Sequence, residues 1–163
     1  MTPDQAQHDY EEAIAQFTAL DDRYWGAAAN RRLGRVMLQR GDYEKAVALC
    51  RRSLALGLES GHKQETATCL ATFAGLAVAH GQSRRAAQLF GAAEARLRQL
   101  DVPLFYGDLY DYEVNLSALR AQLDGAILDA AWAEGERMTL DQAVAYALRE
   151  GEADEPLGSA TRE

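Results

Sequence analysis

Few residues of this chain break a helix or favour a strand. Proline occurs three times in 163 residues, and isoleucine occurs only at Ile14 and Ile127. No apolar run approaches the roughly 20 residues that a membrane-spanning helix needs, and no segment alternates apolar and polar residues as a half-buried strand does. Alanine dominates the apolar residues and favours helix because it loses no side-chain entropy there. These absences predict an all-α protein that does not cross a membrane.

Basic charge and cysteine are also scarce. The 17 lysines and arginines stand against 25 acidic residues, so the formal net charge is −8 and the chain is expected to repel nucleic acid. The two cysteines, Cys50 and Cys69, form no CxxC motif and lie on apolar helix faces. We therefore expect buried, inert thiols. The polar N-terminus shows no signal-peptide pattern, which predicts a cytoplasmic location.

The segments between turn signals show the periodicity of amphipathic helices. Apolar residues recur at spacings of three and four between the glycines Gly41, Gly61, Gly81 and Gly125. Asp42 and Ser83 follow two of these glycines and are predicted to cap the next helices. Each such helix is expected to bury one face against its neighbours.

The C-terminal part has its own turn and helix-capping signals. Asp124-Gly125 predicts a turn before a short helix over 126–137, and Thr139 with Gln142 predicts a capping box that opens a last helix. We therefore expect a helical domain of seven to eight helices over residues 1–150. Residues 151–163 are acidic and nearly free of apolar side chains, which predicts a flexible tail.

Internal similarity suggests how the helices are arranged. The segment DYEKAVAL at 42–49 is similar to DYEEAIAQ at 9–16, and Gly81 to Ala87 restates the turn and helix start that follow Gly41. With the small pair Leu33-Gly34, these residues resemble the tetratricopeptide repeat, in which two antiparallel helices join through a glycine-containing turn. The resemblance implies a right-handed superhelix of helix pairs, an α-solenoid.

A second resemblance concerns the C-terminal half. The segments 76–82 and 85–94, and the later pair AWAEG and TLDQAVAYAL at 131–135 and 139–148, are similar to the helical-repeat sensor regions of large bacterial LuxR-type and MalT-like transcriptional regulators. The resemblance implies a sensor or scaffold module that binds a protein, a peptide or an effector, with other domains of a parent regulator among its partners. A stand-alone tetratricopeptide adaptor is the alternative.

Motifs of catalysis and metal binding are missing. The histidines His8, His62 and His80 are scattered, and the chain has neither a Walker A nor a GxSxG motif. The carboxylate pairs 108/111 and 134/136 are interpreted as solvated, exposed residues. We expect no enzymatic activity, no cofactor and no metal; a metabolite that survives purification would favour an enzyme or a small-molecule-binding domain instead.

One set of residues is predicted to line a binding groove. If the first helix of each pair faces the concave side, five positions fall in register there, namely Arg31, Arg35, Thr68, Tyr112 and Asn115. Arg31 and Arg35 lie one turn apart and suit an acidic peptide or another anion. Salt bridges to neighbouring acidic helices are the competing interpretation of both arginines.

Aromatic residues mark two further features. The stretch YGDLYDYE at 106–113 is either a partner surface or a set of tyrosines packed between repeats. Trp25 and Trp132 lie in helical stripes, and for both we expect a role in the core or between helices.

The first helix should be the second member of a repeat without its first. Its face carrying Tyr10, Ile14 and Phe17 is therefore expected to lack the usual partner, and an uncovered stacking face leaves apolar area in water. Either the chain is a piece of a longer protein or the helix pairs with a second copy, which predicts a homodimer through this end.

Overall fold

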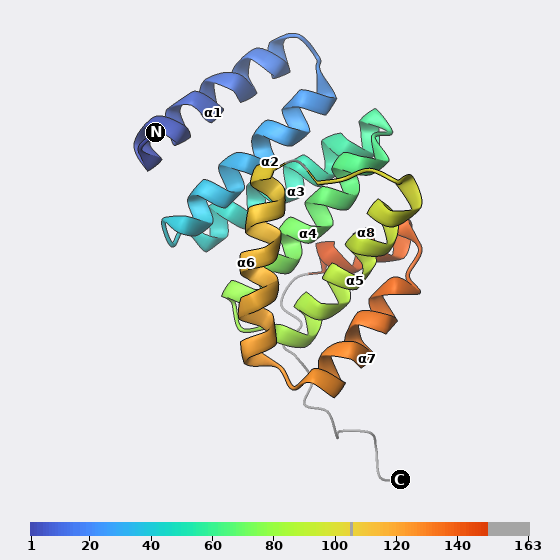
Figure 1. Ribbon diagram of the computed structural model, residues 1–163. Helices are drawn as coiled ribbons and strands as arrows, with labels where there is room; N and C mark the ends of the chain where they lie inside the picture. The colour runs from blue at the N-terminus through green and yellow to red at the C-terminus, as the bar shows by residue number, and fades with distance from the viewer. Residues whose placement is uncertain (105, 150–163) are drawn as a thin grey trace.

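The computed structural model describes residues 1–104 and 106–149, and their fold is all-helical, as predicted (Figure 1). The tail predicted at 151–163 lies outside the described residues. The helices are α1 (Pro3–Ala19), α2 (Arg23–Gln39), α3 (Tyr43–Ser60), α4 (Lys63–Ala79), α5 (Ser83–Leu100), α6 (Tyr106–Gln122), α7 (Gly125–Glu136) and α8 (Leu140–Leu148).

Helices α2 with α3 and α4 with α5 form two antiparallel pairs, the arrangement of a tetratricopeptide-like helical repeat (Figure 1). Gly41, Gly61 and Gly81 end α2, α3 and α4 with positive φ angles of 81°, 71° and 74°, which glycine adopts without a steric penalty. The carboxylate of Asp42 accepts a hydrogen bond from the backbone N–H of Lys45, so its predicted role as a cap is confirmed.

Ser83 does not cap α5. The residue before α5 is Gln82, whose side chain makes no capping hydrogen bond, and the Ser83 hydroxyl instead donates to Oε1 of Gln122 at 3.0 Å. The predicted cap is therefore wrong, because Ser83 lies one residue inside the helix and faces the end of α6.

Small residues let the paired helices approach closely. A Cβ atom on Gly34 would lie 2.9 Å from Sγ of Cys50 and 3.2 Å from the carbonyl oxygen of Ala46, so α2 and α3 touch at this glycine. The equivalent close approach on α4 uses Ala74, which is completely buried. The small residues that carried the repeat resemblance are therefore the ones that set the spacing within each pair.

The third unit departs from the first two. Helix α7 packs on α5, whereas α6 lies along α4 and runs apart from α7 (Figure 1). A Cβ on Gly91 would overlap the backbone oxygen of Trp132, and one on Gly135 would overlap the backbone oxygen of Gln88. These two glycines therefore allow backbone contact between α5 and α7, which leaves α6 outside the tight pair.

Helix α8 closes this end of the molecule against α4 and α5. Its first turn holds both hydrogen bonds of the capping box between Thr139 and Gln142, which confirms that prediction. Ala143, Val144 and Ala147 of α8 are buried. None of the described helices combines the length with the apolar character that crossing a membrane requires.

Helix α2 packs against the face of α1 that was expected to be uncovered. Tyr10 and Ile14 are partly buried against the core, and the ring of Phe17 stacks on Trp25 with ring centres 6.4 Å apart. The expectation of a missing partner is therefore wrong, because α2 supplies that partner. The homodimer through this end stays a prediction. The large apolar side chains exposed here are Met1, Leu20 and Trp25 (87%, 75% and 46% exposed).

The two cysteines lie in the core between α3 and α4, completely buried and unpaired. Burial raises the pKa of Cys69 to about 12 and that of Cys50 well above its usual value. A thiol with that pKa is ionised in about one molecule in ten thousand at about pH 8. We expect neither cysteine to react with dithionitrobenzoate at that pH until the protein is unfolded. Rapid labelling of the folded chain would show that the core opens readily.

Candidate functional site

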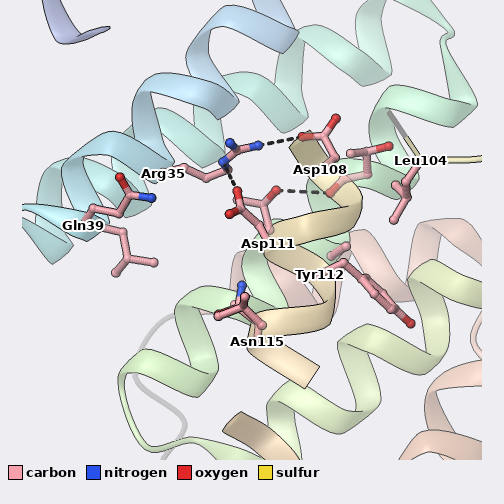
Figure 2. A pocket seen from close by; sticks show the side chains of 13 residues that line it. Arg35, Gln39, Leu104, Asp108, Asp111, Tyr112 and Asn115 are labelled. Carbon is pink, nitrogen blue, oxygen red and sulfur yellow. Dashed lines mark hydrogen bonds and ion pairs between the residues drawn. The ribbon is translucent and has the colours of Figure 1, made fainter. Parts of the chain in front are cut away.

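A groove of about 180 Å³ lies where α2, α4 and α6 meet (Figure 2). These are the first helices of the successive units. The residues that line it are Arg35, Leu38, Gln39, Thr68, Ala71, Thr72, Gly75, Leu104, Asp108, Asp111, Tyr112, Val114 and Asn115.

Four of the five predicted groove residues line this cavity, and the fifth lies behind it. Arg35, Thr68, Tyr112 and Asn115 belong to the lining, whereas Arg31 is buried with 1% of its surface exposed. Periodicity did not show which of the five residues remain accessible. A binding role for the groove stays a prediction.

Arg31 is held by carboxylates from two other helices. Its Nε donates to Oε1 of Glu65 on α4 at 2.7 Å, and its Nη1 donates to Oδ1 of Asp108 on α6 at 2.5 Å. Desolvation alone would lower the pKa of Arg31, but the charges of Glu65 and Asp108 outweigh it and raise the pKa above its usual value. The competing interpretation, salt bridges to neighbouring acidic helices, therefore describes this arginine.

Arg35 joins the same α6 carboxylate and one more. Its Nη1 donates to Oδ1 of Asp108 at 2.8 Å, and its Nε forms an ion pair with Asp111 at 2.5 Å (Figure 2). Unlike Arg31, Arg35 keeps about a quarter of its side-chain surface exposed at the groove. Two arginines one turn apart on α2 therefore face two carboxylates one turn apart on α6.

Glu65, Asp108 and Asp111 are the site residues that the sequence analysis missed. The interpretation of the 108/111 pair as solvated is wrong, because Asp108 is buried and both carboxylates bind arginine. The 134/136 pair also binds cations, with Glu134 on Arg84 and Glu136 on Arg98. The available signal was the matching spacing of opposite charges on two helices predicted to share the inner surface.

Tyr112 and Asn115 extend the contact of α6 along the groove. The Tyr112 hydroxyl donates to Oε2 of Glu94 at 2.8 Å, and burial together with this bond raises the pKa of the phenol. A Cβ on Gly75 would lie 2.6 Å from Nδ2 of Asn115, so the glycine makes room for the amide. Both residues are therefore positioned by α4 and α5.

The other aromatic residues divide between surface and core. Tyr110 is 63% exposed, whereas Tyr112 packs edge-on against Phe90, so the stretch 106–113 is partly surface and partly packing. Trp132 stacks on Phe90 and agrees with its predicted packing role. Trp25 also lies between helices, because its ring stacks on Phe17 of α1, although its place at the outer corner of α1 and α2 leaves it nearly half exposed.

A second cavity, of about 440 Å³, lies between α3, α4, α5 and α8. The guanidinium of Arg51 donates to the carbonyl oxygen of Leu148 at 2.7 Å, and that of Arg85 donates to Ala147 at 3.0 Å. Cations at the C-terminal end of a helix satisfy its last carbonyls. These contacts fasten α8 to the repeats and account for the basic side chains here.

The fold is that of a tetratricopeptide-like helical repeat. The sequence profile of the tetratricopeptide repeat family matches residues 26–99, which cover α3 to α5 and nearly all of α2. No group of three or more potential metal ligands occurs among the residues that the structure describes. Repeats of this family typically serve as non-catalytic interaction modules.

The chain is also similar to proteins of Mycobacterium bovis and Mycobacterium tuberculosis whose names describe them as candidate HTH-type transcriptional regulators. Each is 34% identical over 117 residues, which cover 71% of this chain. The chain spans only 13% of the length of these relatives. No solved structure matches the chain significantly.

Proposed function

We propose that this chain is the helical-repeat sensor or scaffold module of a bacterial transcriptional regulator, and that it binds a protein or peptide partner on the surface formed by α2, α4 and α6. The observation that carries the proposal is the similarity of most of the chain to a small part of much longer proteins named as regulators. The groove supports it, because first helices of successive repeats create the extended inner surface of such proteins. The parent regulator's other domains are then among its partners.

A transcription experiment with a filled groove tests this function. Thr72→Phe adds bulk at a residue that lines the groove, and Ala15→Phe adds the same side chain on the exposed face of α1. In the source organism, we expect deletion of the coding segment and Thr72→Phe to change the same transcripts, while Ala15→Phe leaves them unchanged. Unaltered transcription in the deletion strain would overturn the regulatory role, and a groove variant without effect would move partner binding to another surface.

A stand-alone tetratricopeptide adaptor is the second candidate, favoured by the profile match that covers the repeats alone. The two differ in their surroundings in the genome. A reading frame that continues into ATPase or helix-turn-helix sequence supports the regulator module, whereas a partner that binds the isolated chain without any effect on transcription supports the adaptor.

We expect no sequence-specific DNA binding by this chain itself. Its net charge is −8, and its most prominent arginine pair, Arg31 and Arg35, is already bound to carboxylates. Contacts with DNA phosphates require accessible cations. A mobility-shift assay at physiological salt should show no retention of any particular site, and a specific shifted band would contradict this prediction.

A further inference from the structure

Helix α6 lies on the inner surface, and only part of its length packs there through apolar side chains. Among its described side chains, only Asp108 and Leu119 are buried, while Leu109, Tyr110 and Val114 are exposed. Helix α7, by contrast, meets α5 with direct backbone contact at two glycines. Apolar contacts of Tyr112, Leu116, Ala118 and Leu119 hold the middle and the end of α6, and polar groups hold its beginning.

Those polar groups concentrate at its N-terminal half. Asp108 reaches both Arg31 and Arg35, and Asp111 reaches Arg35. Without these two carboxylates, the two arginines and Glu65 would leave the α2–α4 surface with one net positive charge, much of it away from water. Such a surface requires an anionic partner, because a buried guanidinium without its counter-charges is strongly unfavourable.

We propose that the α2–α4 surface is a docking site for an acidic helix and that α6 is its built-in occupant. This inference rests on the proposed function, since it names the kind of partner that the inner surface accepts. The partner carries carboxylates at positions i and i+3, as Asp108 and Asp111 do, and a small amide at i+7, where Asn115 lies over Gly75. Its carboxylates replace those of α6 on Arg31 and Arg35.

The built-in occupant sets the threshold for binding. A tethered segment competes at an effective concentration on the order of millimolar, so a partner in trans binds weakly until α6 is loosened. The exposed apolar side chains of α6 do not attach the helix to the α2–α4 surface, because they face solvent when α6 occupies that surface. Weakening the contacts of Asp108 and Asp111 should therefore open the docking site.

A labelled peptide tests the proposal directly. The probe is a synthetic peptide of residues 104–122, and its matched control carries Asp108→Asn and Asp111→Asn. Both are titrated by fluorescence anisotropy against the intact chain and against the chain with the same two substitutions. We expect the acidic peptide to bind the substituted chain at least about tenfold more tightly than the intact chain. We also expect the control peptide to bind that chain about tenfold more weakly than the acidic one, and high salt to reduce this difference.

Equal affinity of the two peptides for the substituted chain, or no binding of either to it, would overturn the proposal. Circular dichroism checks that the substituted chain is folded. If it is unfolded, hydrogen exchange on the intact chain tests the proposal instead. There we expect the α6 amides to exchange faster than those of α2 and α4 and to accelerate when the acidic peptide is added. Amides of α6 as protected as those of α4, with no response to the peptide, would also overturn it.

The outcome is separable from that of the transcription experiment. A failed peptide assay with an active Thr72→Phe phenotype removes the acidic-helix partner and keeps the regulatory module. Peptide binding without any transcription phenotype keeps the docking site and removes the proposed function.

Discussion

Gly135→Ala is expected to lower the free energy of unfolding by about 3 kcal/mol, the upper part of the range for overpacked cores. The added methyl group would overlap the backbone oxygen of Gln88, and a backbone atom cannot move aside as a flexible side chain can. Helices α5 and α7 must therefore separate, and their contacts along the interface weaken together. Urea unfolding followed by circular dichroism measures the loss.

Gly125→Ala is the matched control for this substitution. Gly125 begins the same helix, and a Cβ there would meet no atom within 4 Å. Because alanine favours helix over glycine, we expect the stability to stay unchanged or to rise by up to about 1 kcal/mol. Equal effects of the two substitutions would show that helix propensity, rather than the backbone contact of α5 and α7, governs this region.

Arg31→Met is expected to cost about 3–5 kcal/mol of unfolding free energy, the range for breaking a buried ion pair. The substitution leaves both carboxylates buried. Asp108 stays bound to Arg35, whereas Glu65 loses its ion pair with Arg31, in which Nε and Oε1 are 2.7 Å apart. The cost therefore comes from the stranded carboxylate more than from the lost arginine. Chemical unfolding of the variant and the parent chain at neutral pH provides the comparison.

Two further variants isolate that cause. Arg23→Ala removes an exposed arginine of the same helix, whose ion pairs at 3.5 and 3.6 Å should be worth less than about 1 kcal/mol. Combining Arg31→Met with Glu65→Met removes the stranded charge, so the double variant should be more stable than Arg31→Met alone. A double variant less stable than the single one would show that packing around Glu65, not its charge, dominates.

The helical architecture could be predicted because its signals are local. Spacings of three and four residues, the glycines at the helix ends and the Thr139 capping box each act within one or two turns, and the structure contains them as expected. The first two helix pairs followed from the same reasoning, since a small residue such as Gly34 lets two helices approach closely. The same reasoning led to the candidate groove, whose binding role stays a prediction, because a repeat places its first helices on one side.

The partner of each ion pair and the exposure of each residue could not be predicted in this way. Asp108 lies 77 positions from Arg31, and nothing near it in the sequence shows that α6 crosses to α2. Trp25 is a second case: its apolar stripe predicted a role in the core or between helices, and only the packing shows that it lies between α1 and α2 and stays nearly half exposed. Burial depends on which helices pack together. An apolar stripe within one helix therefore predicts which face is apolar but not which element covers that face.

By itself, the sequence determined that this protein is a row of helices in tetratricopeptide-like pairs, because periodicity, capping and turn geometry act between near neighbours in the chain. Only the tertiary structure decided that α7 takes the place beside α5 and that Asp108 of α6 binds both Arg31 and Arg35. The physical reason is distance along the chain. Charges and glycines on separate helices interact only after the helices have packed, and packing depends on all the faces that compete for the same neighbour.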